Sequence, residues 1–269
     1  MDVAARSRIA PLASLGLIAV GGADARAFLH AQLTSDIARL APDRARYAGW
    51  CSAKGRLLAT LLVLPHEDGF LLQLARDLVP GVMKRLAMFV LRAKVQLADA
   101  SDQWMQYGVM CRAPAGLSED LQIARTPDTM EVRIAADRSL VLSRQHLETN
   151  CAESDWRLEE IRAGRPLVTQ ATQDQFVPQM VNFEQLGGVD FQKGCYPGQE
   201  IVARAQYRGQ VKRRMYHVRL RAPLQPGQAL PGGEEAAGTV VDAVGTEALA
   251  VLPIDAVGQY EVIPLPYQH

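Results

Sequence analysis

The stretch Lys193-Gly194-Cys195-Tyr196-Pro197-Gly198-Gln199-Glu200 places an amine, a thiol and a carboxylate within one short, turn-rich segment. Its glycines allow positive φ angles or the close approach of a ligand to the backbone. Pro197 suits the first position of a helix, because the N–H that proline lacks would be unpaired there. We therefore predict a tight turn that leads into a helix through residues 201–204.

The thiol is the most reactive group of this octet. Cys195 is predicted to lie just before the helix N-terminus, where unpaired N–H groups and the helix dipole favour negative charge. With Lys193 two residues away, the thiol should lose its proton more easily than a free cysteine does. Glu200 adds a carboxylate that can accept hydrogen bonds from a ligand. The alternative is a structural turn with an inert buried cysteine. The combination favours a functional site whose catalytic residues are Cys195, Lys193 and Glu200.

The overall composition predicts a cytoplasmic protein without a membrane partner. The chain has 269 residues, is 48% hydrophobic and carries no net charge, so it has no global field that would attract nucleic acid or membrane. Its longest apolar run, around residues 57–64, is far shorter than the ~18 residues of a membrane span. The first residues lack the apolar core of a signal peptide.

Cysteine and histidine spacing does not indicate a metal site or a disulfide framework. The four cysteines, at positions 51, 111, 151 and 195, show no C-x-x-C spacing. The five histidines are scattered, without H-x-x-x-H or H-E-x-x-H spacing. We therefore predict no metal bound by the protein's own ligands.

Hydrophobic periodicity predicts an α+β protein with a β-rich C-terminus. Helices are predicted at residues 23–40, at 78–92 and from the residue after Ser154 to Gly164. Short strands are predicted at 15–20, 47–53, 57–64, 70–75, 95–98, 107–112, 130–134 and 140–142. After Gly209 the chain alternates apolar and polar residues and is punctuated by Pro and Gly, which favours a small barrel of about five or six strands. The predicted domains are residues 1–208 and residues 209–269.

The octet resembles the K-G-C-Y-x-G-Q-E motif of the YgfZ family, folate-binding proteins related to the glycine-cleavage aminomethyltransferase. Three further segments, in the same order, are similar to segments of that family: residues 28–36 (F-L-H-A-Q-L-T-S-D), 51–56 (C-S-A-K-G-R) and 263–267 (I-P-L-P-Y). The likeness covers nearly the whole chain.

This resemblance implies two α+β lobes, interleaved in sequence within residues 1–208, and a terminal β-barrel, arranged around a central opening that binds tetrahydrofolate or a derivative. The residues expected to contact that cofactor are Trp156, Tyr196, Gly198, Gln199, Arg204, Gln32, Asp36 and Lys54. Trp156 could stack on a pterin or aminobenzoyl ring, with core packing as the alternative. Gln32 and Asp36 could instead end a helix, and Lys54 could simply lie in a hairpin turn.

Residues 193–214 contain six Lys or Arg against the single acid Glu200, a local charge of +5. Such a run is commonly a solvated face. Its position beside the octet makes an anion-binding role equally plausible, and the glutamate tail of a folate or an RNA phosphate would fit.

Two functions from different classes follow. The first is a folate-binding accessory factor that supports iron–sulfur cluster assembly or repair and thereby tRNA-modifying iron–sulfur enzymes, with Cys195 as a reactive or transiently ligating thiolate. Its partners would be folate and iron–sulfur client or assembly proteins. The second is a folate-dependent C1-transfer enzyme similar to an aminomethyltransferase, with Asp102 as a candidate carboxylate. We favour the first, a protein that is not a classical enzyme; a scaffold without chemistry is a third possibility.

Overall fold

The computed structural model describes residues 7–110, 117–209, 211–230 and 238–267. The chain divides into two compact units whose segments alternate in sequence. Unit 1 comprises Met1–Arg26, Arg39–Arg46 and Leu62–Trp156, and unit 2 comprises Ala27–Ala38, Tyr47–Leu61 and Arg157–His269. The predicted domain boundary between residues 208 and 209 stays a prediction.

The first sheet belongs to unit 1 and is antiparallel throughout, with strand order β1-β7-β10-β9-β8. Its strands are β1 (Arg8–Pro11), β7 (Met105–Met110), β10 (Arg138–Ser143), β9 (Thr129–Ala135) and β8 (Ile123–Arg125). Burial alternates along β9, because successive side chains of a strand point to opposite faces. The face with the buried side chains of β9 thus contributes to the core.

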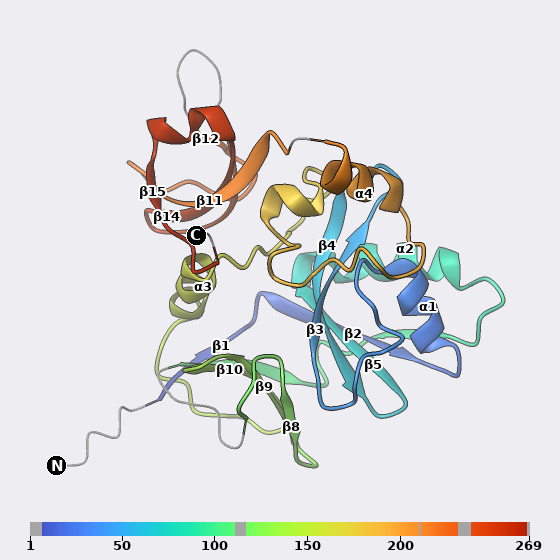
Figure 1. Cartoon of the computed structure of the whole chain (residues 1–269). Coiled ribbons are helices and arrows are strands. Elements are labelled where there is room, and N and C mark those ends of the chain that lie inside the picture. Colours follow the sequence, from blue (N-terminus) through green and yellow to red (C-terminus); the bar gives the residue numbers. More distant parts are fainter. Residues whose placement is uncertain (1–6, 111–116, 210, 231–237, 268–269) are drawn as a thin grey trace. The chain divides into compact units, whose positions relative to one another are not determined.

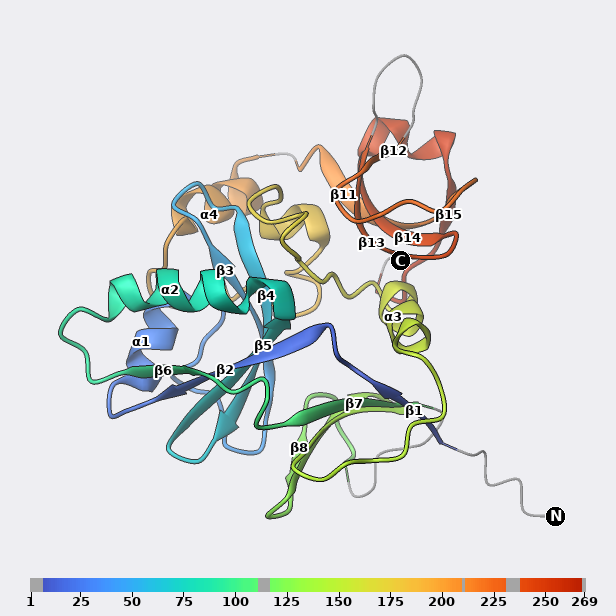
Figure 2. The ribbon, with the colours of Figure 1, turned by 180° about the vertical axis from the view of Figure 1, so that it is seen from behind.

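A second sheet has the order β3-β4-β5-β2-β6. It consists of β3 (Arg46–Cys51), β4 (Leu57–His66), β5 (Gly69–Ala75), β2 (Leu15–Gly21) and β6 (Gln96–Asp99). In unit 1, helix α2 (Val79–Val90) follows the short 3₁₀ turn η1 (Arg76–Leu78) and packs against β2 and β6 (Figure 2). Gly16 permits this contact, because a Cβ there would lie 2.5 Å from a methyl carbon of Val79.

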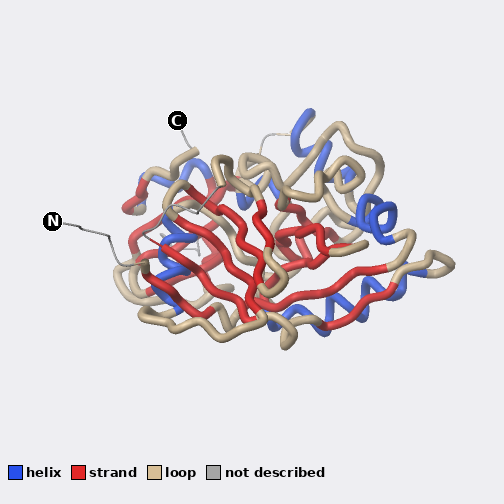
Figure 3. Tube along the Cα trace, turned by 90° about the horizontal axis from the view of Figure 1, so that it is seen from below, coloured by secondary structure: helices blue, strands red, loops and turns tan. Residues whose placement is uncertain are grey.

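The helices α1 (Ala25–Gln32), α3 (Glu153–Arg162) and α4 (Gln199–Tyr207) are short. Between α3 and α4 the chain is mostly loop, apart from the 3₁₀ turn η2 (Pro178–Val181). Figure 3 draws the loops of the chain in tan, the strands in red and the helices in blue. Backbone hydrogen bonds fix this loop to β4: Asp174 N–H donates to the Leu57 carbonyl, and Leu57 N–H donates to the Phe176 carbonyl. The loop is therefore an integral part of unit 2.

The C-terminal strands form the predicted small β module. These strands, coloured orange to red in Figure 1, have the order β12-β13-β14-β11-β15 and curl around an apolar core. The strands are β11 (Arg213–Arg219), β12 (Ala229–Leu230), β13 (Gly238–Val244), β14 (Glu247–Pro253) and β15 (Glu261–Ile263), with the 3₁₀ turn η3 (Ile254–Gln259) before the last. Val218 and Leu220 point into this core, in agreement with the alternation that predicted the first strand.

One predicted element is wrong in length: the helix expected over residues 23–40 ends at Gln32. The hydroxyl of Thr34 donates to the Gly188 carbonyl, and the hydroxyl of Ser35 donates to the Tyr47 carbonyl. These side chains bind distant backbone groups instead of continuing the helix, a competition typical of Ser and Thr. Among the residues described, no helix is both long and apolar enough to span a membrane.

Candidate functional site around the cysteine loop

Helix α4 begins within the octet, two residues later than Pro197: Gly198 is its N-cap and Gln199 its first residue. Gly198 has φ +79°, a left-handed conformation that favours glycine. A Cβ at this position would lie 2.4 Å from the Ser52 carbonyl oxygen and 2.6 Å from the Cα of Gly55. The prediction of Pro197 as the first helical residue is thus wrong, whereas Cys195 lies before the N-cap, as predicted.

Lys193 anchors the loop from one side. Its buried ammonium group donates hydrogen bonds to the carbonyl oxygens of His30 and Leu33, the latter at 2.8 Å. A cation at these carbonyls is favourable, because they lie at the C-terminal end of α1. Burial lowers the pKa of Lys193 to about 8, although Asp36 and Asp190 act in the opposite direction. The amine of Lys193 is therefore hydrogen-bonded to carbonyl groups at the end of α1, and its predicted role in activating the Cys195 thiol stays a prediction.

Tyr196 anchors the other side. Its ring is buried, and the Lys193 Nζ atom lies 4.9 Å from the ring centroid. Burial raises the pKa of the Tyr196 hydroxyl. Between these two buried side chains, Gly194 and Cys195 are exposed. The loop thus presents its thiol to solvent from a backbone held on both sides.

His30 is the residue of this site that sequence reasoning missed. A Cβ on Gly194 would lie 3.8 Å from Nε2 of His30, which places the imidazole beside the residue preceding Cys195. Its Nδ1 atom lies 3.2 Å from Oδ1 of Asp36. The same Nδ1 atom accepts a hydrogen bond of 3.3 Å from the Ala38 N–H, so both contacts orient the imidazole ring. Sequence spacing could not reveal this arrangement, because Gly194 and His30 are far apart in the chain.

The remaining residues predicted in this part of unit 2 occupy different environments. Gln32 is buried, and its Oε1 accepts a hydrogen bond of 3.5 Å from Nε1 of Trp50. Lys54 is exposed in the turn before Gly55, whose backbone contacts Ile201 of α4. All of these residues, together with Asp36 and the whole octet, belong to unit 2.

Trp156 belongs to unit 1. Its buried ring covers Gly108 of β7, where a Cβ would lie 2.2 Å from the indole, and the Arg138 guanidinium lies 5.8 Å from the ring centroid. This environment supports the core-packing alternative, and stacking on a folate ring stays a prediction. Asp102, the candidate carboxylate of the second function, is 91% exposed and forms an ion pair with Arg76 at 2.6 Å.

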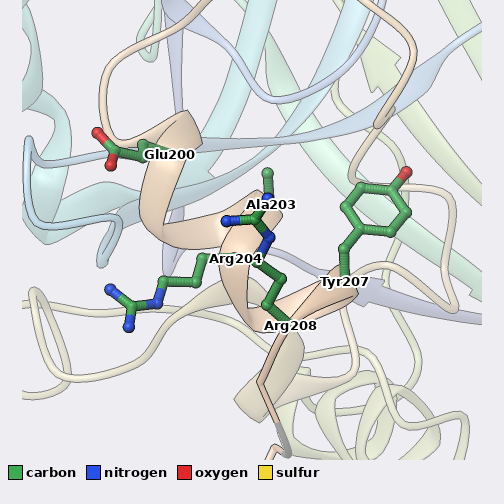
Figure 4. Close-up of a pocket in the computed structure, with 5 residues that line it drawn as sticks. All are labelled: Glu200, Ala203, Arg204, Tyr207 and Arg208. Carbon is green, nitrogen blue, oxygen red and sulfur yellow. The ribbon is translucent and has the colours of Figure 1, made fainter.

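A surface pocket lies on helix α4 and is lined by Glu200, Ala203, Arg204, Tyr207 and Arg208 (Figure 4). Sequence reasoning named Glu200 and Arg204 individually and Arg208 only within the basic run. Tyr207 was missed, although an aromatic residue between two arginines is a pattern that could have drawn attention to it. The pocket combines one carboxylate, one aromatic ring and two guanidinium groups, so it can bind a ligand that carries both amino and acidic groups.

The fold defines the class of protein first. The structure is similar to the glycine cleavage system aminomethyltransferase T from Bartonella henselae, with a TM-score of 0.69 and 16% sequence identity over 93% of this chain and 79% of that chain. Residues 212–264 match the family model described as CAF17, C-terminal beta-barrel domain. The chain thus has an aminomethyltransferase-like α+β fold with a C-terminal barrel, which confirms the predicted fold class.

Sequence comparison defines the family within that class. The tRNA-modifying protein YgfZ of Aliivibrio fischeri (strain MJ11) is 30% identical over 271 residues, which cover 92% of this chain and 85% of that protein. The tRNA-modifying protein YgfZ of Sodalis glossinidius is 31% identical over 296 residues, covering 93% and 90%. This chain belongs to the YgfZ family, which confirms the resemblance found in its motifs.

Proposed function

We propose that this protein is a tetrahydrofolate-binding accessory factor of the cytoplasm. It supports assembly or repair of iron–sulfur clusters and, through them, the iron–sulfur enzymes that modify tRNA. Membership of the YgfZ family supports this proposal, because the relatives compared above are named tRNA-modifying proteins.

The exposed thiol of Cys195 is the observation that carries the proposal. The loop anchors its backbone with two buried side chains and leaves the sulfur accessible. An accessible thiol can attack an electrophilic sulfur or bind a soft metal ion carried by another protein. One cysteine cannot hold a cluster alone, so the cluster is cargo and a partner supplies its other ligands.

The α4 pocket fits parts of a folate. Glu200 can accept hydrogen bonds from the amino group of a pterin, and Arg204 can bind a carboxylate of the glutamate tail. Bound tetrahydrofolate would supply a reduced pterin that carries one-carbon units. The folate contacts of Trp156, Gln32, Asp36, Lys54, Tyr196, Gly198 and Gln199 belong to the same proposal.

Geometry gives the alternative, folate-dependent C1 transfer, less support. Such an enzyme needs a carboxylate positioned near the reacting amine to move its proton. Asp102 is instead on the surface of unit 1 and is paired with Arg76. We therefore rank the accessory function first.

Complementation tests the proposed function. A strain that lacks its own homologue receives the wild-type protein, Cys195→Ala or Cys151→Ala, and a radical iron–sulfur tRNA-modifying enzyme is assayed by mass spectrometry of tRNA nucleosides. Cys151 is half-buried and lies outside the loop, so it is a matched control. We expect loss of modification only with Cys195→Ala, at unchanged protein level and folate affinity. Full modification with Cys195→Ala would contradict the role of the thiol.

A further inference from the structure

The C-terminal end of α4 presents cations that the fold does not use. Arg208 and Lys212 are exposed, and neither forms an ion pair within the part of the chain that the structure describes. Three other arginines of unit 2, Arg157, Arg165 and Arg214, each form an ion pair with a carboxylate. Unused cations a few residues apart, in a protein of zero net charge, indicate an external polyanion.

Tyr207 lines the pocket together with Arg208 and precedes both cations in the chain. It is 69% exposed, and its ring packs edge-to-face against Phe191, with centroids 5.9 Å apart and an interplanar angle of 72°. Phe191 thereby orients the tyrosine ring while most of it stays in solvent. An exposed, oriented aromatic ring beside cations is the arrangement on which single-stranded nucleic acids stack their bases.

The openness of this end favours a polymer over a small ligand. Small-molecule sites bury most of the ligand within a concave pocket. Here Tyr207 and Arg208 are exposed and lie at the end of the helix, whereas Glu200 lies at its beginning (Figure 4). A single strand needs only a stacking platform and cations along its backbone.

We propose that Tyr207, Arg208 and Lys212 form a binding site for single-stranded RNA, with a base stacked on Tyr207 and phosphates on the two cations. The choice of RNA over DNA rests on the proposed function, which links this chain to tRNA modification. The inference goes beyond it by giving the protein a direct contact with RNA, in the same helix that follows the thiol loop.

Fluorescence anisotropy of a labelled oligouridine, titrated with the full-length protein at several salt concentrations, tests this site. The logarithm of the association constant should fall linearly with the logarithm of the salt concentration, and each phosphate contact should add about 0.7 to the steepness of that slope. Arg208→Ala and Lys212→Ala should each reduce that slope by about 0.7. Tyr207→Ala should weaken binding by about 5- to 150-fold at an unchanged slope, and Tyr207→Phe should restore it, because the ring supplies the stacking.

Unit 1 offers matched controls: Phe89 and Arg92 are also exposed, and Phe89→Ala and Arg92→Ala should bind as the wild type does. Equal affinity of the Tyr207→Ala, Arg208→Ala and control variants would overturn the proposal, as would absence of binding to oligouridine.

Calorimetry with tetrahydrofolate triglutamate distinguishes an RNA site from a folate site. If Tyr207→Ala abolishes folate binding and folate displaces the RNA, the site belongs to the cofactor and the RNA assignment is wrong. Complementation with Cys195→Ala reports on the thiol independently of each of these results.

Discussion

The surroundings of the cysteines differ enough to predict their order of reactivity. Burial raises the pKa of the Cys51 thiol to about 12, so almost none of it is ionised at neutral pH. Cys151 is half-buried and Cys195 is exposed. Cys111 lies outside the described residues.

Cys195 should therefore alkylate faster with iodoacetamide at neutral pH than Cys51, Cys111 and Cys151, because thiolate character and access both govern the rate. Mass spectrometry of tryptic peptides over a time course measures each rate in one sample. Cys51, as an internal control, should react only after unfolding. If Cys195 is the slowest of the four, the hypothesis of a functional thiolate fails.

Lys193 should give the protein a specific pH dependence. Its folded pKa of about 8 lies below its ordinary value of 10.5 because burial disfavours the charged form. Between these values the unfolded state binds more protons, so the contribution of Lys193 to stability rises with pH. Urea unfolding of the wild type and of Lys193→Met across this window isolates the effect, since other groups cancel in the difference. A difference that does not change with pH would contradict a depressed pKa.

For single residues, the sequence indicated the octet and the neighbours of the Cys195 thiol, but it did not indicate which groups their side chains contact. His30 was quoted only as part of a family segment, because its relation to Gly194 depends on a contact between distant parts of the chain. The predicted action of Lys193 on Cys195 stays a prediction, and the hydrogen bonds of its amine to the end of α1 were not foreseen. Residue types were readable from the sequence, but the partners of their side chains were not.

At the scale of elements, the start of α4 depends on Gly198. Gly198→Ala should lower the free energy of unfolding by more than about 1 kcal/mol, because it combines an unfavourable positive φ with a clash against Ser52 and Gly55. Gly187→Ala is a matched control, since Gly187 has φ +70° and no atom within 4 Å of the added Cβ. Urea denaturation should show a smaller loss for Gly187→Ala. Equal losses would mean that the backbone angle alone matters.

The ion pair between Arg157 of α3 and Asp242 of β13 connects that helix to the barrel. Asp242 is buried, and burial raises its pKa although Arg157 acts in the opposite direction. Arg157→Ala leaves a buried carboxylate without its partner and should cost about 3 kcal/mol of unfolding free energy. The exposed pair Arg219–Glu261 in the same barrel is the control, and Arg219→Ala should cost about 1 kcal/mol or less. Equal costs would contradict this account.

The length of α1 shows where periodicity fails at this scale. Apolar residues continue at helical spacing beyond Gln32, so the pattern predicted a longer helix. Thr34 and Ser35 are buried and bind carbonyl groups contributed by other parts of the chain. Local pattern cannot anticipate such partners, whereas the barrel strands, whose alternation reflects one shared core, were predicted correctly.

For the whole molecule, the fold class followed from the order of elements and from the family motifs. The resemblance also implied two interleaved lobes, but the bounds of the two units did not follow from the sequence, because segments from three parts of the chain form each of them. Trp156 belongs to unit 1 and the octet to unit 2, and the predicted cofactor contact of Trp156 stays a prediction. Sequence motifs show which residues matter in a family without showing which unit contains them.

The activity of the whole protein provides one further prediction. The purified protein should not catalyse glycine-cleavage-type aminomethyl transfer with tetrahydrofolate and an aminomethyl-carrying donor protein, because Asp102 is exposed and paired with Arg76. A glycine-cleavage aminomethyltransferase is the positive control, and formation of methylenetetrahydrofolate is the measurement. Substantial transfer that Asp102→Asn abolishes and Cys195→Ala leaves intact would make this protein an enzyme.

The three tryptophans are all buried, and they are divided between the units, with Trp50 in unit 2 and Trp104 and Trp156 in unit 1. Each unit thus carries its own shielded fluorophore. The tryptophan fluorescence of a Trp50→Phe variant comes only from unit 1, and that of a variant with Phe at positions 104 and 156 comes only from unit 2. The red shift of each emission on denaturation follows one unit at a time. Coincident midpoints would identify a single cooperative transition, and separate midpoints would identify the unit that opens first.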